Sequence, residues 1–148
     1  MYFKRTLYPL ALLLLYQQNA VASDINPTIT VYTTSHYAIS HQGIATNIYF
    51  LDRVDHIEDQ ISRHFNANPV IAEQQARELF KSPQWKTQEK QLLSAYQGVI
   101  SGWQNGIKKV PAILFEYPNV PTSVIYGETD VSAAKQHWLA WYQQQNQQ

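Results

Sequence analysis

The segment Lys109–Phe115, with the sequence KVPAILF, carries the strongest strand signal in the chain. Its apolar and β-branched residues are typical of a buried strand, and Pro111 lies near its start, where a missing backbone N–H is tolerated. Asn105 and Gly106 come just before it and favour the end of a helix, because glycine readily adopts the left-handed conformation. This stretch therefore predicts a helix that stops at Gly106 and a buried strand that follows it.

The residues on both sides of this strand predict alternating strands and helices. Apolar and β-branched runs indicate further strands at 28–34, 47–51 and 123–126, with a turn at 117–121. The segment 35–43 is polar and is expected to be a loop with one helical turn. Three helices are expected between the second and third strands and one after the last strand, each beginning at a capping residue: Asp52, Asn68, Ser82 and Asp130.

This order of elements predicts an α/β fold with a mixed sheet. It is the order of a thioredoxin-like sheet with a helical insertion between the second and third strands. The long helix after Ser82 is expected to point seven apolar residues inward: Trp85, Leu92, Leu93, Tyr96, Val99, Ile100 and Trp103. Most of the four tryptophans are accordingly expected in the core, with a partly exposed aromatic patch on the last helix as an alternative.

Composition excludes several classes of function. The chain has 148 residues, equal numbers of basic and acidic side chains, and no cysteine. A neutral chain has no overall field to hold nucleic acid, and a chain without cysteine has no disulfide framework, thiolate metal site or cysteine nucleophile.

The N-terminus has the pattern of a secretory signal. Lys4 and Arg5 precede the apolar run Leu10–Tyr16, and Ala20–Ala22 supplies small residues for cleavage. The alternative is a retained anchor, but a spanning helix needs roughly 20 apolar residues and this run is shorter. We therefore expect residues 1–22 to be a cleaved signal peptide and residues 23–148 to form a single periplasmic domain, which has a net charge of −2 after loss of the two basic residues.

The thioredoxin-like order indicates where a binding site would lie. The active turn of such a fold follows the first strand, which here gives Ser35, His36 and Tyr37, followed by Ala38. Without a thiol this turn cannot perform dithiol exchange. Fold analogy further implies a cis bond between Val110 and Pro111 facing this turn, although most X–Pro bonds are trans. Five residues are therefore predicted to form a peptide-binding groove: Ser35, His36, Tyr37, Val110 and Pro111.

Two catalytic or metal hypotheses have weaker support. His36 and His41, or the four residues Asp52, Asp55, His56 and Asp59, could hold a metal, but neither set matches a metal-binding motif. Acidic residues at a helix start are explained more simply by capping and the helix dipole. Ser35 beside His36 lacks the motif of a serine hydrolase. We expect no enzyme activity, no metal and no cofactor.

Several segments resemble one known family. Gly106–Phe115 (GIKKVPAILF), Val124–Val131 (VIYGETDV) and Ala134 resemble the C-terminal half of an integrating conjugative element protein family, and Val31–Thr34 and Ile48–Asp52 resemble its N-terminal half. Members are small exported proteins encoded with the type IV secretion apparatus of mobile genomic islands. They are distantly similar to thioredoxin-like pilus-assembly proteins of F-type conjugation. The resemblance supplies no catalytic residues.

The resemblance implies a periplasmic, non-enzymatic component or assembly factor of a conjugative type IV secretion apparatus, acting on DNA transfer by protein binding. Its expected partners are other apparatus proteins, and direct nucleic-acid binding is not expected from the slightly acidic domain. The alternative is a thiol-independent periplasmic chaperone that holds extended segments of exported or pilus proteins.

Overall fold

A computed structural model describes residues 25–146 and shows a mixed α/β fold with one four-stranded sheet. In chain order its elements are β1 (Thr28–Thr33), the 3-10 helix η1 (Gln42–Ile44), β2 (Asn47–Phe50), α1 (Arg53–Ser62), α2 (Pro69–Lys81), α3 (Pro83–Gln104), β3 (Ala112–Tyr117), β4 (Val120–Tyr126) and α4 (Val131–Gln145). The predicted mixed sheet with helices between the second and third strands is confirmed.

The strands lie in the order β2-β1-β3-β4. β1 pairs in parallel with β2 and antiparallel with β3, and β3 pairs antiparallel with β4. The two central strands are buried almost throughout, which explains why β3 reads as a continuous apolar run in the sequence. The two outer strands, β2 and β4, form the edges of the sheet.

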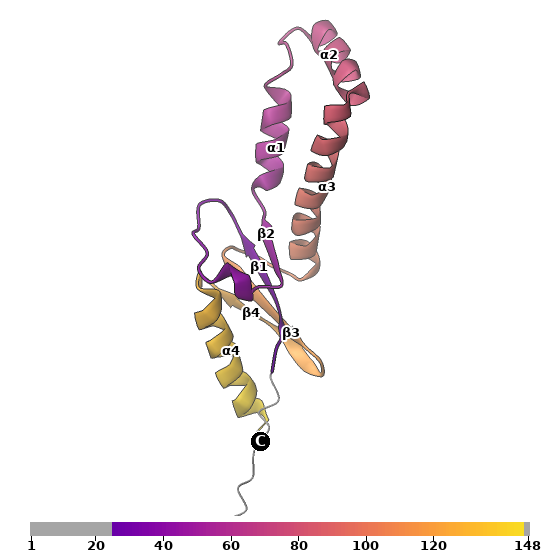
Figure 1. Ribbon diagram of the computed structural model, residues 1–148. Helices are drawn as coiled ribbons and strands as arrows, with labels where there is room; N and C mark the ends of the chain where they lie inside the picture. The colour runs from indigo at the N-terminus through magenta and orange to yellow at the C-terminus, as the bar shows by residue number, and fades with distance from the viewer. Residues whose placement is uncertain (1–24, 147–148) are drawn as a thin grey trace, which may run out of the picture.

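The two faces of the sheet are covered by different helices (Figure 1). α4 packs on one face, where Trp138 stacks on Phe115 with ring centroids 5.6 Å apart. The C-terminal part of α3 reaches the other face, where the buried Tyr32 hydroxyl lies 2.7 Å from Ser101 Oγ and accepts a hydrogen bond from Asn105 Nδ2 at 3.1 Å. These contacts attach the end of α3 to the centre of the sheet.

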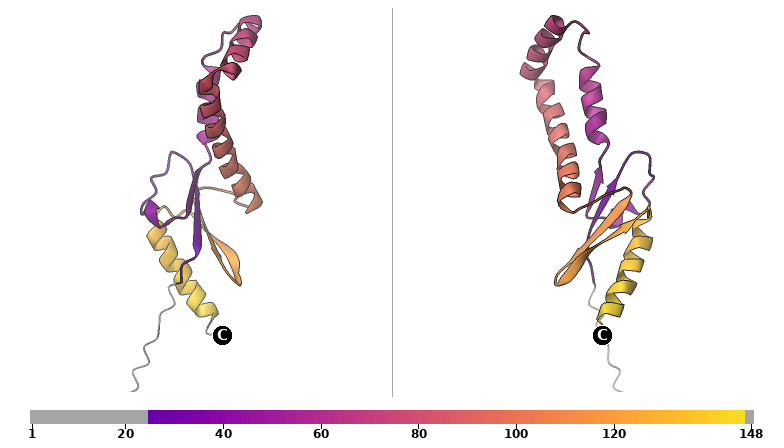
Figure 2. Two further views of the ribbon diagram at one scale, coloured as in Figure 1. Left: turned by 45° about the vertical axis from the view of Figure 1, so that its right-hand side comes forward. Right: turned by 180° about the vertical axis from the view of Figure 1, so that it is seen from behind.

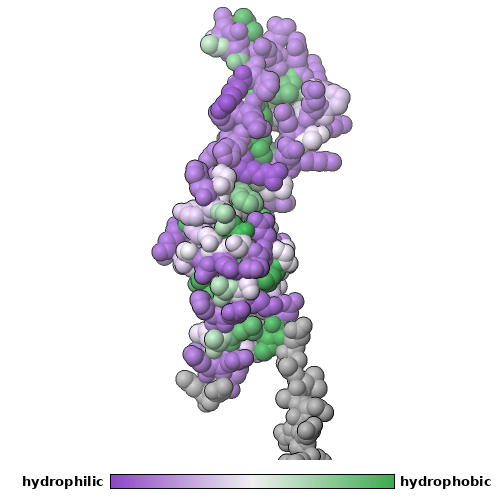
Figure 3. Space-filling view, turned by 60° about the vertical axis from the view of Figure 1, so that its left-hand side comes forward, coloured by the Kyte–Doolittle hydropathy of each residue, from purple (hydrophilic) through white to green (hydrophobic). Residues whose placement is uncertain are grey.

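The three inserted helices form an arm that extends away from the sheet, at the end opposite the C-terminus (Figures 1 and 2). α1 and α3 run side by side through the buried residues Val54, Ile57 and Ala95, and α2 lies at the tip. α2 has no buried residue. The face in Figure 3 shows that hydrophilic side chains cover most of the arm. The arm therefore has a thin core, and most of its surface is exposed.

Three of the four predicted helix caps are confirmed. Asn68 Oδ1 accepts from the N–H of Val70 at 3.0 Å, and Ser82 Oγ accepts from the N–H of Trp85 at 3.2 Å. Asp130 Oδ1 accepts from the N–H groups of Ser132 and Ala133 at 2.8 and 3.2 Å. These bonds satisfy amide groups that have no partner within their own helix.

The prediction that the Asp52 side chain caps α1 is wrong. Asp52 precedes the first residue of α1, but its side chain makes no capping hydrogen bond and its backbone is helical. Its carboxylate is instead turned toward the loop after β1.

The predicted stop at Gly106 is confirmed. Gly106 has a φ of +65°, and its N–H donates to the carbonyl of Trp103 at 3.0 Å. The N–H of Ile107 reaches back to the carbonyl of Gly102 at 2.9 Å. This pair of bonds is the Schellman arrangement, which requires the left-handed conformation that glycine adopts without strain.

The turn that joins β3 and β4 is shorter than predicted. β3 begins at Ala112 and runs on to Tyr117, and β4 begins at Val120. The turn between them is therefore shorter than the predicted 117–121, and Asn119 adopts a φ of +61° in it. Asparagine tolerates this conformation better than most residues, which permits the tight connection.

The predicted core of α3 is largely wrong. The buried residues of α3 are Ala95, Gly98 and Gly102. Trp85 and Leu92 are half-buried, but five residues expected inward are exposed: Leu93, Tyr96, Val99, Ile100 and Trp103. Small residues let α3 approach β2 and β1 closely, so the helix packs through its small side chains and turns its large ones away.

The predicted signal peptide, residues 1–22, lies outside the described residues. Among residues 25–146, no helix combines the length and apolar character needed to cross a bilayer.

Candidate functional site

The predicted groove residues come from two segments at one end of the sheet. Tyr32 pairs with Ala112, so the end of β1 and the Val110–Pro111 pair lie at the same level of the sheet. Ser35, His36 and Tyr37 follow β1 after Thr34, and all three are exposed. The topology therefore brings both predicted segments to this end of the sheet. Whether they bind a peptide stays a prediction.

The predicted cis bond between Val110 and Pro111 is confirmed. Pro111 itself is buried, and its carbonyl oxygen accepts from the N–H of Gly127 at 2.9 Å. Val110 is half-buried. The part of this pair that a partner would reach is therefore Val110 rather than the proline.

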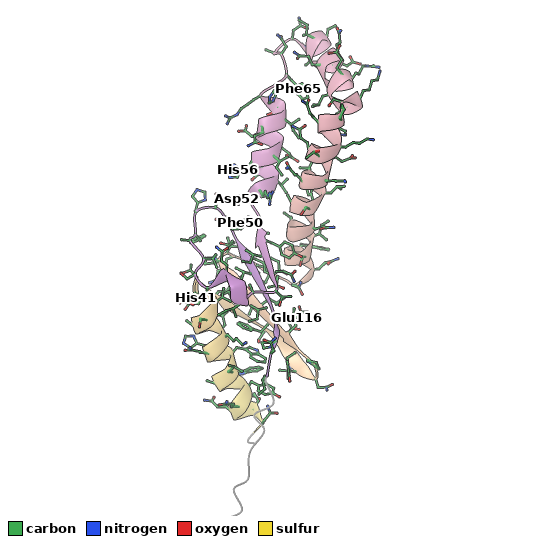
Figure 4. All side chains as sticks on the ribbon, in the orientation of Figure 1. His41, Phe50, Asp52, His56, Phe65 and Glu116 are labelled. Carbon is green, nitrogen blue, oxygen red and sulfur yellow. The ribbon has the colours of Figure 1, made fainter. Side chains whose placement is uncertain are left out.

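Ser35 is held by the carboxylate of Asp52. Asp52 lies at the point where β2 leads into α1 (Figure 4). Asp52 Oδ2 accepts from the N–H of Ser35 at 2.9 Å and from its hydroxyl at 2.5 Å. Partial burial raises the pKa of Asp52, but the hydrogen bonds from Ser35 and the nearby His56 outweigh it, so the net pKa is lowered. This carboxylate fixes the start of the loop after β1 to the base of the arm.

The Ser35, Asp52 and His56 side chains do not form a catalytic triad. His56 Nε2 lies 3.4 Å from the same Asp52 Oδ2 that accepts the serine hydroxyl. A triad needs the imidazole between the serine and the carboxylate, so that it can take the serine proton. Here the hydroxyl donates directly to the carboxylate, and the imidazole does not lie between them.

Three of the residues proposed as metal ligands, His41, Asp52 and Asp59, have partners outside the proposed sets. His41 Nδ1 lies 2.8 Å from Asp130 Oδ1 and ties the loop before η1 to the start of α4. This contact and the N–H groups of α4 lower the pKa of Asp130. Asp59 of α1 pairs with Arg63, the residue that follows the helix. Within residues 25–146 no three histidine or acidic side chains gather as a metal site would require.

A pocket of about 310 Å³ lies at the tip of the arm, between the ends of α1, α2 and α3. Its walls are the apolar side chains of Ile61, Phe65 and Leu79, three glutamines and His64. His64 Nδ1 donates to the carbonyl of Gln60 at 2.7 Å. A single imidazole among amide and apolar groups offers binding contacts but no acid–base pair.

The exposed side of α3 carries several large apolar side chains. Leu93, Ile100 and Trp103 have exposed fractions of 60%, 50% and 82%. Tyr96 lies between them and donates its hydroxyl to Glu58 Oε1 at 2.6 Å, which raises the pKa of Tyr96. The spacing of these residues places them along one side of the helix. We call these four residues the α3 stripe.

The sequence contains a signal that separates the packed side of α3 from the stripe. Ala95, Gly98 and Gly102 recur at spacings of three and four, which also defines one side of a helix. A Cβ at Gly98 would lie 2.9 Å from Tyr49 Cβ, so only glycine permits this approach. The prediction chose the large apolar residues as the buried side of α3, whereas the small residues mark the side that packs.

One protein family matches the chain over residues 26–145, and its description reads "Protein of unknown function (DUF1525)". No curated protein matches the chain. No solved structure matches it either.

Proposed function

The chain belongs to the DUF1525 family, and we propose that it is a non-enzymatic periplasmic component or assembly factor of a conjugative type IV secretion apparatus. It acts by binding other proteins of that apparatus. The link to conjugation is supported by the resemblance of residues 106–115 and 124–131 to integrating conjugative element proteins. The location is supported by the signal pattern of residues 1–22.

The observation that carries protein binding is the α3 stripe. An exposed line of Leu93, Tyr96, Ile100 and Trp103 costs free energy in water, because apolar side chains are more stable when buried. Apolar patches of this kind, especially beside polar residues, mark interaction surfaces. Tyr and Trp are also enriched where protein interfaces are most tightly packed.

A non-enzymatic role is supported by the candidate site itself. Ser35 donates its hydroxyl to Asp52, and the neighbouring His56 contacts the carboxylate rather than the serine. The chain has no cysteine that could act as a nucleophile or redox group.

We further propose that the sheet is a thioredoxin-like variant. The strand order β2-β1-β3-β4, with one parallel pair and two antiparallel pairs, supports this assignment, as does the cis bond just before β3. The connection between β1 and β2 departs from the thioredoxin-like pattern, because the short η1 is the only helix in it.

The stripe is tested by placing the same charge on two sides of α3. Trp103→Glu places a carboxylate in the stripe, and Ser94→Glu places one at an exposed residue on the opposite side of the helix from Trp103. In cells that lack the native chain, we expect Trp103→Glu to reduce conjugative transfer strongly and Ser94→Glu to restore it. Immunoblots of the periplasmic fraction check that both variants accumulate equally.

Three results would contradict the proposal. Transfer and apparatus assembly could be unchanged when the gene is deleted, which would refute the role in conjugation. Equal activity of the two variants would refute the stripe as a binding surface. Recovery of the chain outside the periplasmic fraction would refute its location.

The chaperone alternative draws on the exposed segment Ser35–Tyr37 beside Val110 at one end of the sheet. Light scattering that follows the aggregation of an unfolded exported protein distinguishes this alternative from the first proposal. A chaperone would slow aggregation at stoichiometric concentration, whereas a specific apparatus component would not.

A further inference from the structure

β4 is an edge strand whose sequence is protected only near its start, where Pro121 lies. In the part of the chain that the structure describes, β4 pairs with β3 on one side and has no strand on the other. Its residues, VPTSVIY, include no charged side chain. Natural edge strands commonly carry lysine or other charges that prevent pairing with another chain. The bulge opposite Phe115–Tyr117 protects the start of β4 but leaves residues 123–126 regular.

The register identifies the backbone groups that face the free side. The N–H of Gly127 donates to the carbonyl of Pro111 at 2.9 Å, which makes these two residues a hydrogen-bonded pair. Antiparallel pairs alternate, so Ile125 and Ser123 also bond to β3. The N–H and C=O groups of Val124 and Tyr126 therefore point outward, where an added strand would meet them.

An apolar pocket lies directly beside these groups, between β4 and α4. It has a volume of about 280 Å³, and its walls include Ser123, Ile125, His137, Trp138 and Trp141. The Trp138 indole N–H donates to Ser123 Oγ at 3.0 Å, so both polar groups already have partners. What remains in the pocket is mainly indole and aliphatic surface.

A second, smaller pocket continues along the same edge. It has a volume of about 120 Å³, lies near Val120 and Pro121, and shares Trp141 with the first. The two pockets therefore form one line between β4 and α4. A strand with alternate side chains facing α4 matches such a line, because every second residue of a strand points to the same face.

We infer that the β4–α4 edge binds an extended peptide segment of another protein, which adds to the sheet beside β4. Its backbone pairs with Val124 and Tyr126, and a large uncharged apolar side chain enters the pocket formed by Ser123, Ile125, His137, Trp138 and Trp141. The backbone gives affinity for any extended chain, and the pocket selects the side chain. This inference is independent of the proposed role in conjugation and of the α3 stripe.

The first test uses a displayed library of random peptides panned against the full chain. We expect enriched sequences with a large apolar residue and no charge next to it. The best of these, made as a labelled synthetic peptide, should bind in fluorescence anisotropy. Hydrogen exchange should show new protection of the Val124 and Tyr126 amides in the complex, since these two face the added strand.

Two matched pairs of variants then separate the backbone from the pocket. Tyr126→Pro removes the outward N–H, whereas Tyr126→Val removes the same ring and keeps the N–H. We expect binding of the synthetic peptide to weaken about tenfold or more in the first only. His137→Glu places a charge on the pocket wall, and Gln136→Glu places it at the neighbouring exposed residue of α4. A comparable loss is expected for His137→Glu alone, because the peptide would bury an unpaired charge.

Each contrary outcome overturns the inference. Failure of the library to enrich any sequence would do so, as would equal binding by both members of either pair. A concentration-dependent dimer in sedimentation, abolished by Tyr126→Pro, would show that a second copy of the chain occupies the edge instead. None of these results affects the transfer assay, so the two proposals fail separately.

Discussion

Replacing Gly98 with alanine tests how closely α3 approaches β2. The added Cβ would lie 2.9 Å from Tyr49 Cβ and 3.0 Å from its Cδ1. The first of these atoms is attached to the backbone of β2, so it cannot move aside without moving the strand. Gly102→Ala is the matched control on the same helix, since its Cβ would meet Tyr32 Cδ1 at an ordinary 3.5 Å.

Two opposing effects determine the magnitude. Alanine gains about 0.8–1 kcal/mol over glycine in a helix interior. Overpacking a close contact costs about 1–3 kcal/mol. We therefore expect Gly98→Ala to lower the free energy of unfolding by about 1 kcal/mol. Gly102→Ala keeps the helix gain without the clash and should raise it by about 0.5–1 kcal/mol.

Urea unfolding followed by circular dichroism measures both variants. The midpoints should move in opposite directions, with unchanged slopes. Adding Tyr49→Ala should reduce only part of the cost of Gly98→Ala, because it removes the ring atoms but keeps the Cβ that the new methyl group meets at 2.9 Å. Equal stabilisation by the two glycine replacements would refute the close contact between α3 and β2.

Three other predictions concern the core, the caps and the pH dependence. Trp138→Ala should lower the free energy of unfolding by about 3–5 kcal/mol, because it removes a buried ring that stacks on Phe115. Trp103→Ala should change this free energy by no more than about 0.5 kcal/mol in thermal unfolding. Similar losses for both variants would contradict the burial of Trp138. Ser82→Ala should cost about 0.5–2 kcal/mol through loss of the α3 cap, and an unchanged urea midpoint would argue against that hydrogen bond. The lowered pKa of Asp130 contributes stability above its ordinary value of 3.8, and this contribution is lost as the pH falls through the lower folded pKa. Asp130→Asn should therefore flatten stability across this acidic range, and a variant with the same acid profile as the native chain would refute the assignment.

The order and type of the elements could be predicted because they depend on local chemistry. Asn68 and Ser82 each precede a proline and carry a side-chain acceptor, which together define a helix start. Gly106 similarly defines the end of α3. The cap at Asp52 failed because its carboxylate found a partner in Ser35, which is distant in sequence and becomes a neighbour only when β1 and β2 pair.

The candidate surfaces could be predicted only in part. The sequence placed Ser35–Tyr37 and Val110–Pro111 at one end of a sheet, and the register agrees. The α3 stripe was missed because its large apolar residues were expected inward, whereas the small residues Ala95, Gly98 and Gly102 mark the side that packs.

The sequence by itself determined the absence of thiol chemistry, the positions of the strands and most helix boundaries, because these depend on residue type and on neighbours within a few positions. Only the tertiary structure decided which side of α3 is exposed, that β4 is an edge, and that a pocket lies beside it. These features depend on which elements pack together. In α3 that choice is made by the small residues Ala95, Gly98 and Gly102, which permit a close approach that larger residues prevent.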